Sequence, residues 1–217
     1  MVDTPRAVLW DMDGTLVDSE EYHWIAWRDT MADLGHPITR QQFLQSFGQK
    51  NDTILKAWLG AVATPELIAQ VGDAKEERYR HLVRENGVSP LPGVQSWIHR
   101  LYAQQWRQAI ASAAPRQNVE VVLETLKFAN CFQGIVSAED VRKGKPDPEV
   151  YLTAAERVGA SPARCIVVED ARAGIEGARR AGMRSIGVSR DHASLDADLV
   201  VASVDLLDPN AFDSLLP

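Results

Sequence analysis

The chain has 217 residues, of which 45% are hydrophobic and 24% charged, and its formal net charge at pH 7 is -7. This acidic balance argues against a nucleic-acid partner, because binding to a phosphate backbone requires a basic face. No apolar run approaches the roughly 18 residues that a membrane span requires, so we expect no membrane partner and a cytoplasmic location.

Two cysteines, Cys131 and Cys165, stand far apart in the sequence and lack the spacing of metal ligands. Both lie among apolar residues. We therefore expect two buried free thiols, with a disulfide as the minor alternative, as is typical of a reducing compartment.

The first predicted element is a short buried strand over the apolar residues 7–10, followed directly by Asp11-Met12-Asp13-Gly14-Thr15. Alternate side chains of an extended segment share a face, so Asp11 and Asp13 can point the same way. Two such carboxylates repel each other unless a cation or a proton intervenes. Mg²⁺, a hard cation that takes oxygen ligands, is the usual partner. The pair predicts a metal site that includes a candidate carboxylate nucleophile, and an ordinary Asx turn is the alternative.

A long stretch of helical character follows, from about residue 19 to residue 86. It is rich in Glu, Gln, Ala, Leu and Arg, and its apolar residues recur at helical intervals. Breaks at residues 35–37, at Gly60, at Thr64-Pro65 and at Gly87 divide it into four or five short helices. Thr64 is a good helix start, because Pro65 then occupies the first helical position.

Beyond a Pro-rich connector at residues 88–93, apolar strands alternate with amphipathic helices. We predict strands at 108–111, 134–136, 165–168, 184–188 and 199–201, and helices at 116–128, 148–158 and 173–181. This alternation is typical of an α/β fold, in which helices flank a parallel sheet that also contains the first strand. The helical block is then an insertion above the carboxyl edge of the sheet, where ligands bind and where a cap can exclude water.

Three further polar segments follow predicted strands or precede helices. Ser112 and the backbone N–H of Ala113 lie at a helix entrance, which is a suitable place for an anion, although Ser112 could be a simple strand-end residue. Lys145 precedes a proline, which restricts it to extended geometry. Glu169 and Asp170 repeat the acidic pair after a buried strand, and helix capping by Asp170 is the alternative there.

The segments Asp11-Met12-Asp13-Gly14-Thr15, Ser112, Gly144-Lys145-Pro146-Asp147-Pro148 and Glu169-Asp170 occur in the order of the four motifs of the haloacid dehalogenase (HAD) superfamily, which the chain resembles over nearly its whole length. The resemblance is to the phosphatase and β-phosphoglucomutase-like group with a helical cap. It implies a Rossmann-like core formed by residues 1–16 and 91–217, and an α-helical cap formed by residues 17–90.

The resemblance also implies a role for each motif residue. Asp11 would attack phosphorus and become an aspartyl-phosphate, while Asp13 would protonate the leaving group and later activate water. Ser112, Ala113 and Lys145 would bind the transferring phosphoryl group. Mg²⁺ would be held by Asp11, by the backbone carbonyl of Asp13 and by Asp170, with Glu169 binding directly or through water. Thr15 would support the loop.

The cap residues bear on the choice of substrate. Glu21-Tyr22-His23 with Trp27 one turn later resembles the β-phosphoglucomutase cap, and Lys75 falls where such mutases carry a cap lysine. Each of these residues could instead be an ordinary surface or packing residue. Mutases place an arginine at the position of Asn51, which cannot supply a bidentate charge to a second phosphate. The adjacent Lys50 could substitute only in part.

These features favour a phosphatase that acts on a small phosphate monoester, such as a sugar phosphate, and a β-phosphoglucomutase-type mutase is the alternative. Dehalogenation ranks lower because the acidic pair at residues 169–170 is retained, and phosphonate cleavage lacks a suitably placed lysine. A binding module without catalysis would be expected to lack at least one motif residue. We expect a monomer, because the cap must move relative to the core.

Overall fold

In the computed structural model, which describes residues 5–189 and 195–216, six parallel strands form one sheet in the order β3-β2-β1-β4-β5-β6. The strands are β1 (Ala7–Trp10), β2 (Arg107–Ala111), β3 (Gly134–Val136), β4 (Cys165–Glu169), β5 (Arg184–Val188) and β6 (Leu199–Val201). This arrangement confirms the α/β fold predicted from the sequence. Residues 1–4, 190–194 and 217 of the predicted core segments lie outside the described residues.

The central strand β1 pairs with β2 on one side and with β4 on the other, and all four of its residues are fully buried. Val8 and Trp10 belong to the hydrophobic cluster on one face of the sheet, and Ala7 and Leu9 belong to the cluster on the opposite face. A continuous apolar run is expected for a parallel strand that is covered on both faces. The position immediately after β1 therefore opens at the carboxyl edge of the sheet.

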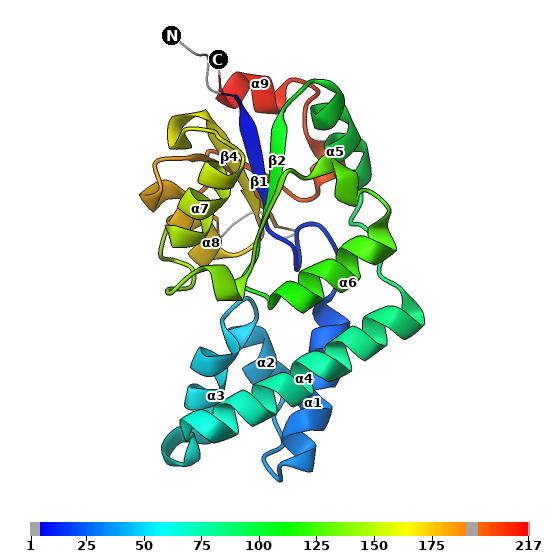
Figure 1. Cartoon of the computed structure of the whole chain (residues 1–217), viewed down its shortest axis with the longest axis vertical. Helices are drawn as coiled ribbons and strands as arrows, with labels where there is room; N and C mark the ends of the chain where they lie inside the picture. The colour runs from blue at the N-terminus through cyan, green and yellow to red at the C-terminus, as the bar shows by residue number, and fades with distance from the viewer. Residues whose placement is uncertain (1–4, 190–194, 217) are drawn as a thin grey trace.

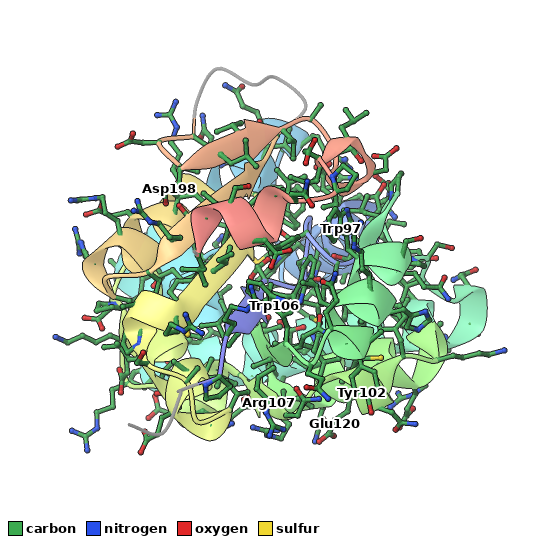
Figure 2. The ribbon with its side chains drawn as sticks, turned by 90° about the horizontal axis from the view of Figure 1, so that it is seen from above. Trp97, Tyr102, Trp106, Arg107, Glu120 and Asp198 are labelled. Atoms are coloured by element: carbon green, nitrogen blue, oxygen red, sulfur yellow. The ribbon has the colours of Figure 1, made fainter. Side chains whose placement is uncertain are left out.

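Helices cover both faces (Figure 1). One face packs against α5 (Val94–Ala103), α6 (Arg116–Leu126) and α9 (Ala211–Leu215), and the other against α7 (Glu149–Arg157) and α8 (Arg172–Arg180). Figure 2 looks onto the end that carries α9, where Trp97 and Trp106 lie. The ring of Phe212 from α9 lies 5.0 Å from that of Trp97 and 6.0 Å from that of Trp106, so α9 closes this end of the core.

The inserted block contains four α-helices, α1 (Glu20–Asp33), α2 (Arg40–Ser46), α3 (Asn51–Leu59) and α4 (Pro65–Asn86), all within the continuously described stretch 5–189. It has its own hydrophobic cluster, whose buried members are Trp27, Met31, Phe43, Ile54, Leu55, Leu59 and Val71. Figure 1 shows the block beyond one edge of the sheet, with α4 passing close to α6.

The predicted helix breaks are confirmed, because α1 ends before Gly35, α3 ends before Gly60 and α4 ends before Gly87. The Thr64 hydroxyl accepts a hydrogen bond from the backbone N–H of Leu67 at 3.2 Å, as expected for the start of α4. The 22-residue α4 is longer than the short helices predicted.

Short 3₁₀ turns connect several elements; they span Gly60–Val62, Ala129–Cys131, Ala138–Asp140, Pro162–Arg164 and Val204–Leu206. Cys131 and Cys165 are both free and buried, as expected. Within the described part of the chain, none of the helices is long and apolar enough to cross a membrane.

Asp140 links three parts of the core and carries a testable consequence for stability. Its carboxylate accepts hydrogen bonds from Arg157 at 2.6 Å, from Arg116 at 2.5 Å, and from the backbone N–H and hydroxyl of Ser137, both at 2.8 Å. The hydrogen bond from Arg157 is the largest of the influences that hold the pKa of Asp140 well below its usual range. The ionised form therefore stabilises the folded state above about pH 4, and this contribution is lost as the pH falls through the lowered pKa.

We expect Asp140→Asn to lower the free energy of unfolding at pH 7 by about 1–3 kcal/mol, because two arginines then lose a charged partner. The difference between variant and wild type should shrink at pH 3, because there Asp140 is largely protonated in the unfolded wild type, whereas it keeps its charge in the folded state. Urea unfolding at pH 7 and at pH 3 measures it. The matched control is Glu156→Gln on α7, whose side chain is exposed, and it should change stability little. Equal stability of Asp140→Asn and wild type at pH 7 would contradict this assignment.

Candidate active site

The four motif segments meet at the carboxyl edge of the sheet, on the side that faces the helical block. Asp11 follows β1, Ser112 follows β2, Glu169 ends β4 and Asp170 comes next, while Lys145 lies in the loop before α7. All five line one cavity of about 410 Å³, together with residues from α1, α2, α3 and α4. Parallel strands end at the same edge, which is why residues so distant in the sequence come together.

An acidic cluster lies at the floor of this cavity. One carboxylate oxygen each from Asp11, Glu169 and Asp170 lies within 4.8 Å of the others. The Lys145 ammonium group lies 2.5 Å from Oδ1 of Asp11 and 2.6 Å from Oε1 of Glu169. Three largely buried carboxylates therefore face one ammonium group, which leaves an excess of negative charge.

Burial and this excess of negative charge together raise the pKa values of two members of the cluster. Burial raises the pKa of Asp11 to about 7, with Lys145 opposing the shift and Glu169 adding to it. Burial, followed by the charges of Glu169 and Asp11, raises the pKa of Asp170 well above its usual range. The donors are all hard oxygen atoms, so the residues present fit a divalent cation of the Mg²⁺ type.

Neighbouring residues fix the acidic cluster in place. The Tyr151 hydroxyl donates to Oε1 of Glu169 at 3.1 Å, and the backbone N–H of Ala171 donates to Oε2 at 2.7 Å. Gly14 has φ = +86°, and a Cβ there would lie 2.2 Å from Oδ2 of Asp170. The position therefore requires glycine both for its backbone conformation and for the close approach of the carboxylate. The Thr15 hydroxyl donates to Oδ1 of Asp170 at 3.4 Å.

Asp13 occupies a different environment from Asp11. Its Oδ1 atom accepts hydrogen bonds from the Ser19 hydroxyl at 2.5 Å, from Nε2 of His23 at 3.1 Å and from the Tyr79 hydroxyl at 3.4 Å. Burial alone would raise the pKa of Asp13, but the hydrogen bonds from His23 and from the hydroxyl of Ser19 hold it below its usual value. Its carboxylate is not part of the acidic cluster. The prediction that its backbone carbonyl binds metal stays a prediction.

His23 connects Asp13 to the interior of the helical block. Its ring stacks on that of Tyr79 with centroids 4.0 Å apart, and its Nδ1 lies 2.8 Å from Nζ of Lys75. Because an ammonium group can only donate, Nδ1 is the acceptor and Nε2 carries the proton offered to Asp13. Lys75 also lies 5.2 Å above the ring of Trp27. His23, Trp27 and Lys75 all line the cavity.

Asn51, at the position where mutases carry an arginine, and the adjacent Lys50 have different surroundings. Asn51 lines the cavity, and its amide donates to Oε1 of Glu76 at 2.7 Å. The Lys50 amine instead lies 3.3 Å from the backbone carbonyls of both Ala138 and Val141 in the core. Lys50 therefore links the helical block to the core in this conformation, and its suggested contact with substrate stays a prediction.

The sequence analysis missed Glu76 and Asn118, which are both buried and hydrogen-bonded to each other. The sequence contains a pattern that could have indicated Glu76. Val71, Lys75, Tyr79 and Val83 repeat every fourth residue and form the buried face of α4, so a lysine occupies a core position. A buried lysine requires a partner, and Glu76 is adjacent to it.

Comparison with known proteins agrees with this geometry. A family profile described as haloacid dehalogenase-like hydrolase matches residues 8–188. The β-phosphoglucomutase of Bacillus subtilis (strain 168) is 32% identical over 204 residues, which cover 90% of this chain and 88% of that protein. Hexitol phosphatase B of Escherichia coli (strain K12) is 34% identical over 212 residues, which cover 94% and 93%.

Among solved structures, that of β-phosphoglucomutase from Clostridium difficile superposes with a TM-score of 0.88 at 27% identity, covering 98% of this chain and 97% of that one. This chain therefore belongs to the haloacid dehalogenase-like hydrolase family, and it is an enzyme of that type. The family resemblance inferred from the four motifs is confirmed.

Proposed function

We propose that this protein is a Mg²⁺-dependent phosphatase that hydrolyses a small phosphate monoester, such as a sugar phosphate, through an aspartyl-phosphate on Asp11. The observation that carries the proposal is the position of Lys145, whose ammonium group bridges Asp11 and Glu169 at the floor of the cavity. An amine there neutralises the carboxylate that must approach an anionic phosphate. The named activity of relatives such as hexitol phosphatase B supports the same class of reaction.

The roles of the chain's own residues follow from their positions. The negative charge of the bound phosphate raises the pKa of the neighbouring Asp13, which takes up a proton from solvent. An Asp11 oxygen then attacks phosphorus, the bond from phosphorus to the alcohol oxygen breaks, and Asp13 gives that oxygen its proton. Water then attacks the phosphorus of the aspartyl-phosphate and passes a proton to Asp13, which releases phosphate and restores Asp11. The hydrogen bonds from His23 and Ser19 hold Asp13 in position for both steps.

The phosphate oxygens require compensation for their charge. Ser112 and Ala113, in the loop that leads to α6, line the cavity, as does Lys145 in the loop before α7. The Ser112 hydroxyl, the backbone N–H of Ala113 and the Lys145 ammonium group would bind these oxygens. Asp11, the carbonyl of Asp13, Glu169 and Asp170 would hold Mg²⁺. When bound, the ion supplies positive charge that stabilises the phosphate oxygens during transfer.

Hydrolysis ranks above a β-phosphoglucomutase-type reaction, although the similarity to β-phosphoglucomutases is substantial. A mutase must hold a bisphosphate intermediate by its second phosphate. Asn51 supplies no charge for this, and its amide is already hydrogen-bonded to Glu76. The partner we propose is a small phosphorylated metabolite that binds to a monomeric enzyme.

We expect the purified protein with Mg²⁺ to release phosphate from a panel of sugar and alditol monophosphates and from p-nitrophenyl phosphate. Treatment with EDTA should abolish the release and added Mg²⁺ should restore it, because the acidic cluster otherwise repels the phosphate. β-Glucose 1-phosphate with a bisphosphate primer serves as the competing assay. Formation of glucose 6-phosphate without much free phosphate would favour the mutase instead.

A further inference from the structure

The part of the cavity lined by α3 and α4 contains a charged pair that the proposed chemistry does not use. Lys75 and Glu76 line the cavity, yet their side chains are only 2% and 6% exposed. The Lys75 ammonium lies 2.9 Å from Oε1 of Glu76. The charge of Lys75 is therefore matched inside the protein and is not available to a second anionic group of a substrate.

Glu76 is held by residues of both the helical block and the core. Its Oε1 accepts from Asn51 at 2.7 Å and from Lys75, while its Oε2 accepts from Nδ2 of Asn118 at 2.6 Å. Asn118 belongs to α6 of the core, and its own carbonyl accepts from Arg80 at 3.1 Å. Burial alone would raise the pKa of Glu76, but the charge and hydrogen bond of Lys75 hold it below its usual value. The carboxylate is therefore fixed and ionised at neutral pH.

A carboxylate held in this way distinguishes between ligands. It offers about four lone-pair positions, of which three are occupied by protein donors, so one remains for a donor on the substrate. A hydroxyl group can donate there, whereas a phosphate would place like charges together at a largely buried site. Arg172, at the start of α8, also lines the cavity, but it is exposed and water screens its charge.

We propose that Glu76 is a specificity-determining residue, which selects a leaving group that presents a hydroxyl group and rejects one that carries a second phosphate. The inference rests on the proposed phosphatase function and adds the class of substrate: the monophosphate of a neutral polyhydroxy compound. Asn51 and Asn118 position Glu76, one from the helical block and one from the core.

The test compares kcat/KM for two matched pairs: fructose 1-phosphate with fructose 1,6-bisphosphate, and glucose 6-phosphate with glucose 1,6-bisphosphate. In the pair whose monophosphate has the higher kcat/KM, we expect the wild type to prefer the monophosphate over the bisphosphate at least about tenfold. This is the size of effect that one misplaced charge produces. In Glu76→Gln the preference should fall to within about threefold, because the repulsion is gone while the shape is kept. Both constants come from one sample, so partial unfolding cancels in their ratio.

Glu77→Gln is the matched control, because it makes the same change one residue along α4 at an exposed position, and it should keep the wild-type ratio. A wild-type ratio near one, or one that favours the bisphosphate, overturns the inference without any variant. An unchanged ratio in Glu76→Gln also overturns it. Turnover of p-nitrophenyl phosphate separates the two proposals: if the wild type releases no phosphate even from this ester, the phosphatase function fails and the inference fails with it.

Discussion

Asp11→Asn is expected to lower phosphate release by at least about 10⁴-fold, the scale on which removal of a catalytic nucleophile acts. An amide cannot form the aspartyl-phosphate, and it offers Lys145 no charge. The fold should survive, because Asn has the same shape and three carboxylates currently face one ammonium group in the cluster. The measurement is phosphate release under saturating Mg²⁺, with circular dichroism to follow thermal unfolding.

The matched control is Asp18→Asn, which makes the same chemical change at an exposed position in the segment that follows the motif. It should retain wild-type turnover. A folded Asp11→Asn enzyme with activity close to wild type would rule out the covalent route, and a direct attack by water would then have to be considered.

Gly174→Ala is the second change with a large expected effect. We expect it to destabilise the protein, whereas a change from glycine to alanine in a helix ordinarily stabilises it. Alanine in a helix is normally about 1 kcal/mol more favourable than glycine. Here a Cβ would lie 1.9 Å from Oε1 and 2.0 Å from Cδ of Glu169. That side chain cannot simply turn aside, because Lys145, Tyr151 and the backbone of Ala171 hold it. Either α8 moves or the acidic cluster opens.

We expect Gly174→Ala to lose about 1–3 kcal/mol of stability by overpacking. Its turnover should fall about 100-fold, because a displacement of roughly 1 Å at a reacting site has that effect. The control is Gly72→Ala in α4, where the nearest atoms to a new Cβ belong to Asn51 at 3.7 and 3.8 Å. That variant should be at least as stable as wild type. If Gly174→Ala unfolds at a higher temperature and keeps full activity, Glu169 is less constrained than its contacts indicate.

Most of the sheet could be predicted because its strands are short apolar runs with clear ends. The predicted strands at 134–136, 184–188 and 199–201 match the observed bounds, and β2 and β4 differ by one residue at one end. Helix α5 was missed although its buried residues Val94, Trp97, Ile98 and Leu101 follow the helical period. The five-residue α9 is too short to show such a period, and its position depends on packing of Phe212 against three tryptophans.

The motif residues could be predicted because each lies beside a strand end, so the fold class alone brings them to one edge. The contact between Glu76 and Asn118 could not be predicted in this way. The two residues are 42 positions apart and come from the inserted block and the core, so their meeting depends on how these two parts pack. No local pattern carries that information. The pairing of Lys75 with Glu76 is different, because the four-residue repeat of buried positions on α4 indicates a buried lysine and therefore a partner nearby.

Alternate residues of β1 pack into the two hydrophobic clusters, and this has a consequence for the direction of the Asp11 side chain. A slip of this strand by one residue would exchange Trp10 with Leu9 between the two layers, and would drive an indole among the small side chains of Ala109 and Ala111. Steric clashes in the two hydrophobic layers would therefore oppose any shift of β1. The packing of the strand thus fixes the direction of the Asp11 side chain. The position of the Asp11 carboxylate depends in this way on apolar packing. A substitution of an apolar residue on β1 would therefore displace the nucleophile and lower activity, although no polar residue is changed.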